Sequence, residues 1–478
     1  MLCGKVLNLC TIDTYHSVKN ADMAESFDVI VIGAGMSGLA AAIRLAMYDK
    51  KVCLLEQHAI AGGLNSYYRR GERKLDVGLH AMTNYAPVLN RSCPLGKMLK
   101  QLRLPHEVLR LMPQKQSAIA FPSARLNFNN EPAFFQAEVS RVFPHQSEAF
   151  LNMWGAINNI PIGDLKAPWA SARQFVRKFL SEPLLEDMLF CPILYYGSAW
   201  EEDMDLQQFA VMFRSIFMEG FCRPEGGIRP LLQWLVNRYK ELGGDLRFRC
   251  SVAEITTVDQ RVVGVKTAKG EELLAPVVLS SMGRPETETA LYGHPKQSRL
   301  GRLGFVETIL MHDTKPCQWG VDDTIVFWSQ QDKFNYREAH GEMDDHSAVI
   351  CFPNNFERDD QTEGICRVTR LASYSAWKNL SAEAYGPAKR QVEHSARQLL
   401  KNWAPHPIGQ ETFSDTFTPL TIERFTRHAQ GAIYGSPDKS RDGHTGVQGL
   451  ELIGTDQGFL GIVGAMLSGI SIANQKLL

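Results

Sequence analysis

Three glycines, Gly33, Gly35 and Gly38, follow directly on an apolar, β-branched run at residues 29–32. Such a run is typical of a strand that is buried on both faces of a parallel sheet. Gly33 permits a tight turn, Gly35 allows a pyrophosphate to approach the backbone closely, and Gly38 allows the next helix to pack against the strand. The helix that begins near Ser37 directs free N–H groups and the positive end of its dipole toward the phosphates. This spacing therefore predicts a phosphate-binding strand, turn and helix.

An acid follows at the distance that this chemistry requires. Glu56 comes directly after the next apolar segment, residues 52–55, where a carboxylate accepts hydrogen bonds from the ribose hydroxyls of adenosine. The paired glycines Gly62 and Gly63 come shortly afterwards. A tight turn without a ligand is the alternative, but the strand, the helix and the acid together favour an adenine dinucleotide as the ligand.

The composition excludes several classes of protein. Of the 478 residues, 44% are hydrophobic and 22% are charged, which is typical of a globular chain with two or three domain-sized cores. The 51 basic and 52 acidic residues nearly cancel and form no long run of like charge, so we expect no nucleic-acid partner. The ten cysteines include no Cys-x-x-Cys pair, which predicts neither a metal site nor a redox disulfide. We expect them to be reduced thiols of a cytosolic protein.

The amino-terminal segment and the hydropathy bear on location. Residues 1–26 lack the apolar core of a signal peptide, so we expect a flexible leader, or a true start at Met23 rather than Met1. No stretch reaches the ~18 apolar residues that a membrane-spanning helix needs. We therefore expect a cytoplasmic protein and leave open a peripheral association with a membrane surface.

Periodicity places the other elements. Leu232, Leu235 and Tyr239 share one face of a predicted helix, which the pair Gly243-Gly244 ends. Apolar runs predict strands at residues 246–255, 262–267, 277–280, 309–312, 324–328, 348–352 and 450–453. A long amphipathic pattern predicts a helix at residues 383–403.

In four blocks the chain resembles the flavin amine oxidase and phytoene desaturase superfamily, and it does so over nearly its whole length. The blocks are residues 33–38 with Glu56 and Gly62-Gly63, residues 75–80, residues 224–227 with Val252, and residues 454–456 with Gly464-Ala465 and Ser468-Gly469. Residues 418–425, followed by residues 431–435, resemble the branch of carotenoid isomerases, retinol saturases and bacterial phytoene desaturases. There are two departures from the pattern. Leu64-Asn65 stands where many relatives carry Arg, and residues 456–460 replace a tract rich in proline and glycine.

The resemblance implies an α/β fold, in which a Rossmann-type, glutathione-reductase-like FAD-binding domain carries an inserted, mixed α+β substrate domain. We assign residues 27–85, 221–295 and 411–478 to a discontinuous FAD-binding domain. Residues 86–220, which read as mostly helical, and residues 296–410, which read as mixed, form the substrate-binding insertion.

The resemblance also implies FAD as the cofactor. The residues that it implies for cofactor binding are Gly33, Ala34, Gly35, Ser37, Gly38, Glu56, Gln57, Gly62, Gly63, Leu64, Val252, Gly454, Asp456 and Val463. Asp456 resembles the residue that contacts the ribityl and pyrophosphate portion, and Val252 resembles the residue whose backbone touches adenine. No second glycine fingerprint follows a strand, so we expect no nicotinamide domain, and the electron acceptor is oxygen, a quinone or a separate reductase.

The function that follows is an FAD-dependent oxidoreductase that desaturates or saturates a hydrophobic, isoprenoid or polyene-like substrate. Flavin N5 accepts or gives a hydride, and burial of apolar area, at ~25 cal/mol per Å², binds such a substrate. His80 and Arg424 are the candidate catalytic residues. Three alternatives stay open: a non-redox cis/trans isomerase that uses reduced FAD, a flavin amine oxidase, and a prenyl-binding protein like the Rab dissociation inhibitors.

Overall fold

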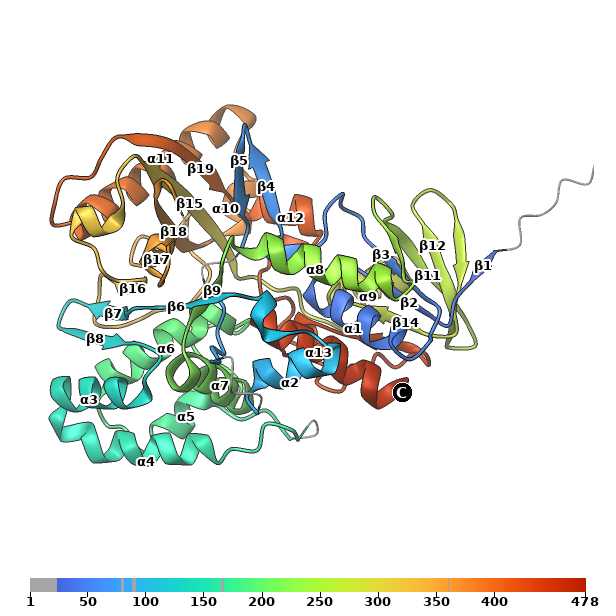
Figure 1. Cartoon of the computed structure of the whole chain (residues 1–478), viewed down its shortest axis with the longest axis horizontal. Helices are drawn as coiled ribbons and strands as arrows, with labels where there is room; N and C mark the ends of the chain where they lie inside the picture. Colours follow the sequence, from blue (N-terminus) through green and yellow to red (C-terminus); the bar gives the residue numbers. More distant parts are fainter. Residues whose placement is uncertain (1–23, 79–80, 88–91, 165–166, 360) are drawn as a thin grey trace, which may run out of the picture.

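The computed structural model describes residues 24–78, 81–87, 92–164, 167–359 and 361–478. His80 and nearly all of the predicted leader, including Met23, lie outside the described residues. The described chain forms two lobes (Figure 1). One contains a five-stranded and a four-stranded sheet, and the other contains a seven-stranded sheet with a group of helices beside it.

The first lobe is built on a parallel sheet with the strand order β10-β3-β2-β14-β20. These strands are β2 (Val29–Ile32), β3 (Val52–Leu55), β10 (Asp245–Arg247), β14 (Val278–Ser280) and β20 (Leu450–Leu452). The side chains alternate, so that one face packs against helices α1 (Met36–Ala46), α8 (Ile228–Glu241) and α13 (Gly461–Lys476). The opposite face packs against the sheet of β1 (Glu25–Ser26), β11 (Val252–Val258), β12 (Arg261–Thr267) and β13 (Glu272–Leu274). β2 and β3 are therefore buried on both faces, as their apolar runs predict.

Distant segments meet in this sheet. β2 and β3 come from the first predicted segment, β10 and β14 from the second, and β20 and α13 from the third. The carboxyl-terminal segment lies directly beside the glycine turn, because a Cβ added at Gly454 would stand 2.8 Å from Ser37 Oγ. α13 also packs along α1. The predicted α/β fold is thus confirmed.

The second lobe is built on a mixed sheet with the strand order β19-β15-β18-β17-β16-β7-β8. Its strands are β7 (Ser117–Phe121), β8 (Ala124–Phe128), β15 (Gly304–His312), β16 (Ile325–Ser329), β17 (Ser347–Cys351), β18 (Gly364–Ala372) and β19 (Glu411–Phe417). Helix α11 (Ala382–Trp403) packs on one face of the sheet. The other face shares an aromatic core with α3 (Pro132–Val142), α4 (Ser147–Asn158), α5 (Ala172–Val176), α6 (Pro183–Gly197) and α7 (Leu206–Phe213). Figure 1 shows these helices below the sheet.

Two elements differ from the expected pattern. The predicted strand at residues 246–255 is divided into β10 and β11, because Arg249 has a φ of +53° and the intervening residues cross from one sheet to the other. The Arg249 and Cys250 N–H groups donate to the carbonyls of His58 and Glu56 during this crossing. β19 pairs with β15 in the seven-stranded sheet, although its residues fall in the third segment of the predicted FAD-binding domain.

Candidate cofactor site and active site

The three glycines of the turn between β2 and α1 have three different physical roles. Gly33 has a φ of +93°, which favours glycine. A Cβ at Gly38 would overlap the carbonyl oxygen of Gly33, so this position serves the close approach of helix and strand. A Cβ at Gly35 would meet no atom within 4 Å, and the backbone there, with φ −71°, suits any residue. The protein itself therefore does not require glycine at position 35, whereas a ligand that lies against the backbone does.

Glu56 follows β3 with its carboxylate buried. Oε2 accepts a hydrogen bond from the Ala34 N–H at 2.8 Å, and Oε1 accepts one from the His58 N–H at 2.8 Å. Burial raises the pKa of this carboxyl group, and the hydrogen bonds oppose that effect. Each oxygen keeps further lone pairs, which can accept hydrogen bonds from ligand hydroxyl groups.

A cavity of about 1230 Å³ runs along this edge of the sheet. It exceeds the ~300–1,000 Å³ of most small-molecule sites, which suits an extended dinucleotide. The predicted site residues on its wall are Gly33, Gly35, Glu56, Gln57, Gly63, Leu64, Val252 and Arg424. Val77 also lines this wall.

The other predicted residues, among those that the structure describes, stand beside or behind the wall: Ala34, Ser37, Gly38, Gly62, Gly454, Asp456 and Val463. Gly62 donates its N–H to the Ala34 carbonyl at 2.8 Å, which joins the paired glycines to the turn. Gly454 contacts Ser37, as described above, and Val463 is buried in the first turn of α13.

Asp456 is buried and bonded to protein groups. Its Oδ2 accepts the Arg284 N–H at 2.6 Å, and its Oδ1 accepts the Ser436 N–H at 2.9 Å and the Lys439 ammonium at 3.0 Å. Burial lowers the pKa of Lys439, and the carboxylate of Asp456 opposes that effect. The carboxylate thus joins the start of α9 (Arg284–Tyr292) to residues 436–439. Contact of Asp456 with the ribityl chain stays a prediction.

Beside the cavity, the chain bends tightly after β5 (Arg73–Asp76). A Cβ at Gly78 would stand 2.6 Å from the Leu64 carbonyl oxygen, so this bend packs directly on the paired-glycine segment. Arg367 of β18 donates to the carbonyls of Asp76 at 3.1 Å and Val77 at 2.7 Å. Its guanidinium also pairs with Glu307 of β15. Contacts from the second lobe, which contains the seven-stranded sheet, therefore fix the bend that precedes His80 in the sequence.

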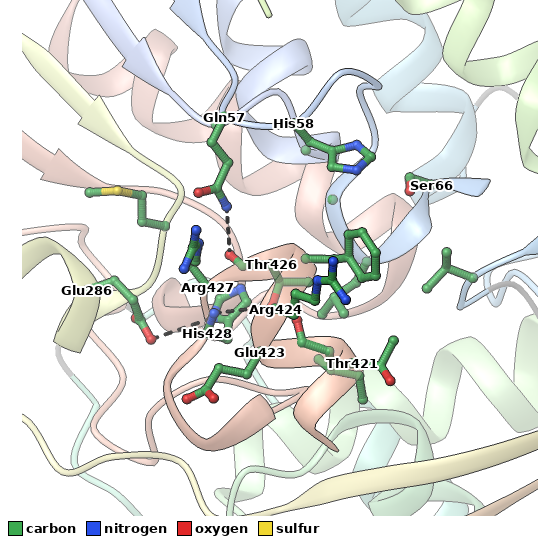
Figure 2. Close-up of a pocket in the computed structure, with 18 of the residues that line it drawn as sticks. Gln57, His58, Ser66, Glu286, Thr421, Glu423, Arg424, Thr426, Arg427 and His428 are labelled. Atoms are coloured by element: carbon green, nitrogen blue, oxygen red, sulfur yellow. Dashed lines mark hydrogen bonds and ion pairs between the residues drawn. The ribbon is translucent and has the colours of Figure 1, made fainter. Parts of the chain in front are cut away.

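Another wall of the cavity comes from α12 (Pro419–Thr426) and the turn after it, and Figure 2 shows labelled residues of this wall near Gln57, His58 and Glu286. Gln57 Nε2 donates to the Thr426 carbonyl at 3.2 Å, and the rings of His58 and Phe425 meet edge to face at 5.7 Å. In the sequence, this segment resembles one branch of the superfamily, and Arg424 within it is a candidate catalytic residue. Its place across the groove follows from contacts between residues more than 360 positions apart, for which the sequence carries no local signal.

The residues of the groove fit an adenine dinucleotide. The open backbone at Gly35, the N-terminus of α1 and the buried acceptor Glu56 provide for a diphosphate and for ribose hydroxyls. The bend at Val77 joins the cavity wall to the seven-stranded sheet, because Arg367 of β18 donates to the Val77 carbonyl. Through this bend, the second lobe contacts the cofactor groove.

Comparison with known proteins agrees with this geometry. The 4,4'-diaponeurosporene oxygenase of Staphylococcus aureus is 24% identical over 85% of this chain and 87% of its own length. The chloroplastic prolycopene isomerase of Arabidopsis thaliana is 23% identical over 97% of this chain and 84% of its own length. A crystal structure of an oxidoreductase from Methanosarcina mazei has the same fold, with a TM-score of 0.66 and 14% identity over 94% of this chain and 100% of its own.

The family model described as flavin-containing amine oxidoreductase matches residues 36–475, which is most of the chain. The predicted resemblance is thus confirmed, and with it FAD as the cofactor and the class of FAD-dependent oxidoreductases. The chain belongs to the flavin-containing amine oxidoreductase family.

Proposed function

We propose that this enzyme desaturates or saturates a long isoprenoid or polyene substrate. The observation that carries the substrate class is the likeness to prolycopene isomerase and 4,4'-diaponeurosporene oxygenase, whose names denote carotenoid substrates, over 97% and 85% of the chain. The second lobe supports the proposal, because it contains a large aromatic core between its sheet and its helices.

The junction of the two lobes is apolar. Leu460 precedes α13 and packs against Gly197 at the end of α6, where an added Cβ would stand 2.9 Å from Leu460 Cδ1. Tyr195 and Tyr434 join this region to Phe305 of β15 through ring contacts at 5.9 and 6.1 Å. A hydrocarbon held among such side chains gains affinity from apolar area, at ~25 cal/mol per Å².

FAD supplies the chemistry, since its N5 accepts or donates a hydride. The chain supplies position: the glycine turn and Glu56 orient the adenosine diphosphate half, and the bend at residues 76–78 faces the other half. We propose that the predicted cofactor residues act in these ways, and that the three segments around the five-stranded sheet form the FAD-binding domain. His80 and Arg424 remain proposed catalytic residues. Oxygen, a quinone or a separate reductase remains the proposed electron acceptor.

A second candidate is cis/trans isomerisation with reduced FAD. The likeness to prolycopene isomerase over 97% of the chain specifically favours it. Isomerisation needs the same apolar site and the same cofactor groove, so the two reactions differ in their products rather than in the parts of the protein that they use.

We also propose a peripheral contact with membranes, where such substrates dissolve. Within the described part of the chain, no helix has the length and apolar character to cross a bilayer. Ile162 and Trp169, on the connection between α4 and α5, are 47% and 50% exposed. Exposed apolar and aromatic side chains of this kind favour a bilayer interface.

The test is an anaerobic incubation of the FAD-loaded protein with prolycopene or 4,4'-diaponeurosporene in detergent micelles, followed by mass and absorption analysis of the products. A mass change of two hydrogens, with matching reduction or oxidation of the flavin, supports the proposed redox function. An unchanged mass with altered double-bond geometry supports the isomerase. Bound but unchanged polyene indicates a prenyl-binding role, and oxidation of amines alone indicates an amine oxidase.

A further inference from the structure

A short segment crosses the cofactor groove. Residues 423–429, at the end of α12 and in the turn after it, line the same cavity as the glycine turn. Gln57 donates to the Thr426 carbonyl at 3.2 Å on one side of the groove. Glu286 of α9 accepts the Ala429 N–H at 2.7 Å on the other side. The segment is therefore anchored at both edges.

The two anchors are supported by aromatic and electrostatic contacts. The ring of Phe425 meets the ring of His58 at one edge. At the other edge the buried Nδ1 of His428 stands 3.9 Å from Glu286 Oε1 and has no hydrogen-bond partner within the described chain. Burial raises the pKa of Glu286, and His428 opposes that effect. Figure 2 shows both anchors, with the segment between them.

Two arginines of the segment carry positive charge into the groove. Arg424 and Arg427 are exposed and line the cavity, and neither has an ion pair among the residues that the structure describes. In Figure 2 the guanidinium of Arg427 lies between Gln57 and Glu286, and Arg424 points toward the side of His58 and Ser66. The nearby acid Glu423 is engaged, because it accepts hydrogen bonds from the Tyr374 hydroxyl at 2.7 Å and the Gln430 N–H at 3.3 Å.

The backbone on either side of the second anchor is unusual. Arg427 and Gln430 have φ values of +64° and +59°, which residues other than glycine rarely adopt, and Gly431 follows with +61°. Such positions persist when contacts around them hold the chain, and they absorb changes of direction when those contacts open. The chain can therefore change direction at the carboxyl-terminal end of this segment.

We infer that residues 423–429 form a clasp over the adenosine diphosphate half of FAD, and that Arg427 binds the cofactor diphosphate from the wall that this segment provides. The contacts of Gln57 and Glu286 hold the clasp shut, and FAD leaves only when they open. The inference rests on FAD as the cofactor and is independent of the substrate.

The experiment measures FAD affinity and release with purified holoprotein and its apoprotein, using the fluorescence that flavin regains in solution. Arg427→Gln is compared with Arg390→Gln, an exposed arginine on α11 away from the cavity. We expect Arg427→Gln to weaken FAD binding about tenfold at low salt, since a charge-assisted contact is lost, and to reduce the salt dependence of the dissociation constant. Equal affinities in the two variants would overturn the role of Arg427.

The anchor is tested by Glu286→Ala against Glu288→Ala, a neighbouring acid of α9 that does not line the cavity. We expect Glu286→Ala to release FAD about tenfold faster, and Glu288→Ala to release it at the wild-type rate. Hydrogen exchange gives a second measurement, in which FAD should protect the amides of residues 427–430 as well as those of residues 33–38. Protection of residues 33–38 alone would overturn the clasp and leave the cofactor assignment intact, whereas failure of the wild type to bind FAD would overturn both.

Discussion

Gly35 and Gly38 stand three residues apart, and substitution should affect them in different ways. A side chain at Gly35 points into open cavity, where the diphosphate of FAD is expected. We expect Gly35→Val to fold with a loss of about 1 kcal/mol, because valine is a poor N-cap residue. FAD affinity should fall about tenfold to a hundredfold, as overpacking against a ligand costs ~1–3 kcal/mol. Flavin absorbance after reconstitution and a denaturation curve of the apoprotein measure the two effects.

Gly38→Val is the matched comparison. Its Cβ would overlap the Gly33 carbonyl, which belongs to the fixed turn. We expect the apoprotein itself to lose at least ~1–3 kcal/mol of stability, because helix and strand must separate. If both variants fold equally well and both keep FAD, then position 35 does not face the diphosphate.

Glu56 gives FAD binding a pH dependence. Burial raises the pKa of its carboxyl group above the usual value, and the ionised form is the better acceptor for ribose hydroxyls. FAD then prefers the ionised form, so the dissociation constant should rise as the pH falls through the raised pKa of the apoprotein. Titration of FAD between pH 7 and 5 measures this dependence. In Glu56→Gln we expect weaker binding and a flat profile over the same range; an unchanged slope would assign the titration to another group.

Among the elements, the bend after β5 depends most on a partner from the other lobe. Arg367 pairs with Glu307 and donates to two carbonyls of the bend; Arg367, Glu307 and Asp76 are buried, and Val77 is half-buried. Burial alone would lower the pKa of Arg367, but Glu307 reverses that effect and raises it. We expect Arg367→Met to lose about 3–5 kcal/mol of unfolding free energy, because the substitution leaves a carboxylate buried without its cation. Urea denaturation of the apoprotein measures the loss.

The double variant Arg367→Met with Glu307→Leu separates the charge effect from the effect on the bend. Removal of both charges should restore part of the stability, since no unpaired ion remains buried. The two carbonyls of the bend still lack the arginine, so FAD affinity should stay below that of the wild type. Full recovery of affinity would show that the arginine acts only through its pair with Glu307.

The elements also show how far the sequence predicts this molecule. The glycine turn, β2, β3 and the end of β3 at Glu56 follow from short-range patterns, because one strand, one turn and one helix determine them. α11, β15, β16 and β17 follow from periodicity in the same way, whereas β7, β8, β18 and β19 are not among the predicted strands. The break between β10 and β11 does not, because Arg249 carries a positive φ that no local residue type requires. The clasp of residues 423–429 does not follow from short-range patterns either, because Gln57 and Thr426 meet only in the completed fold.

At the scale of the whole molecule, the proposed membrane contact rests on two exposed apolar side chains of the second lobe. Ile162 and Trp169 are on the connection between α4 and α5. We expect the double variant Ile162→Ser with Trp169→Ser to sediment less with phospholipid vesicles than the wild type, since both removed side chains contribute apolar area. The control is the double variant Tyr48→Ser with Val258→Ser, which removes comparably exposed apolar side chains from the first lobe. Equal sedimentation of the two double variants would place the membrane contact elsewhere.

The chain passes back and forth between the two lobes, so FAD should stabilise both together. β2, β14 and β20 come from separate segments but join in one sheet at the cofactor groove. Arg367 of the second lobe contacts the wall of the same groove at Val77. A ligand at 100 times its dissociation constant adds ~2.7 kcal/mol, which for a chain of this length corresponds to a rise of about 2–3 °C in Tm. We expect calorimetry to show one transition that FAD moves upward in the wild type and moves much less in Gly35→Val. Two transitions, of which FAD moves only one, would mean that the lobes unfold independently in spite of the interleaved chain.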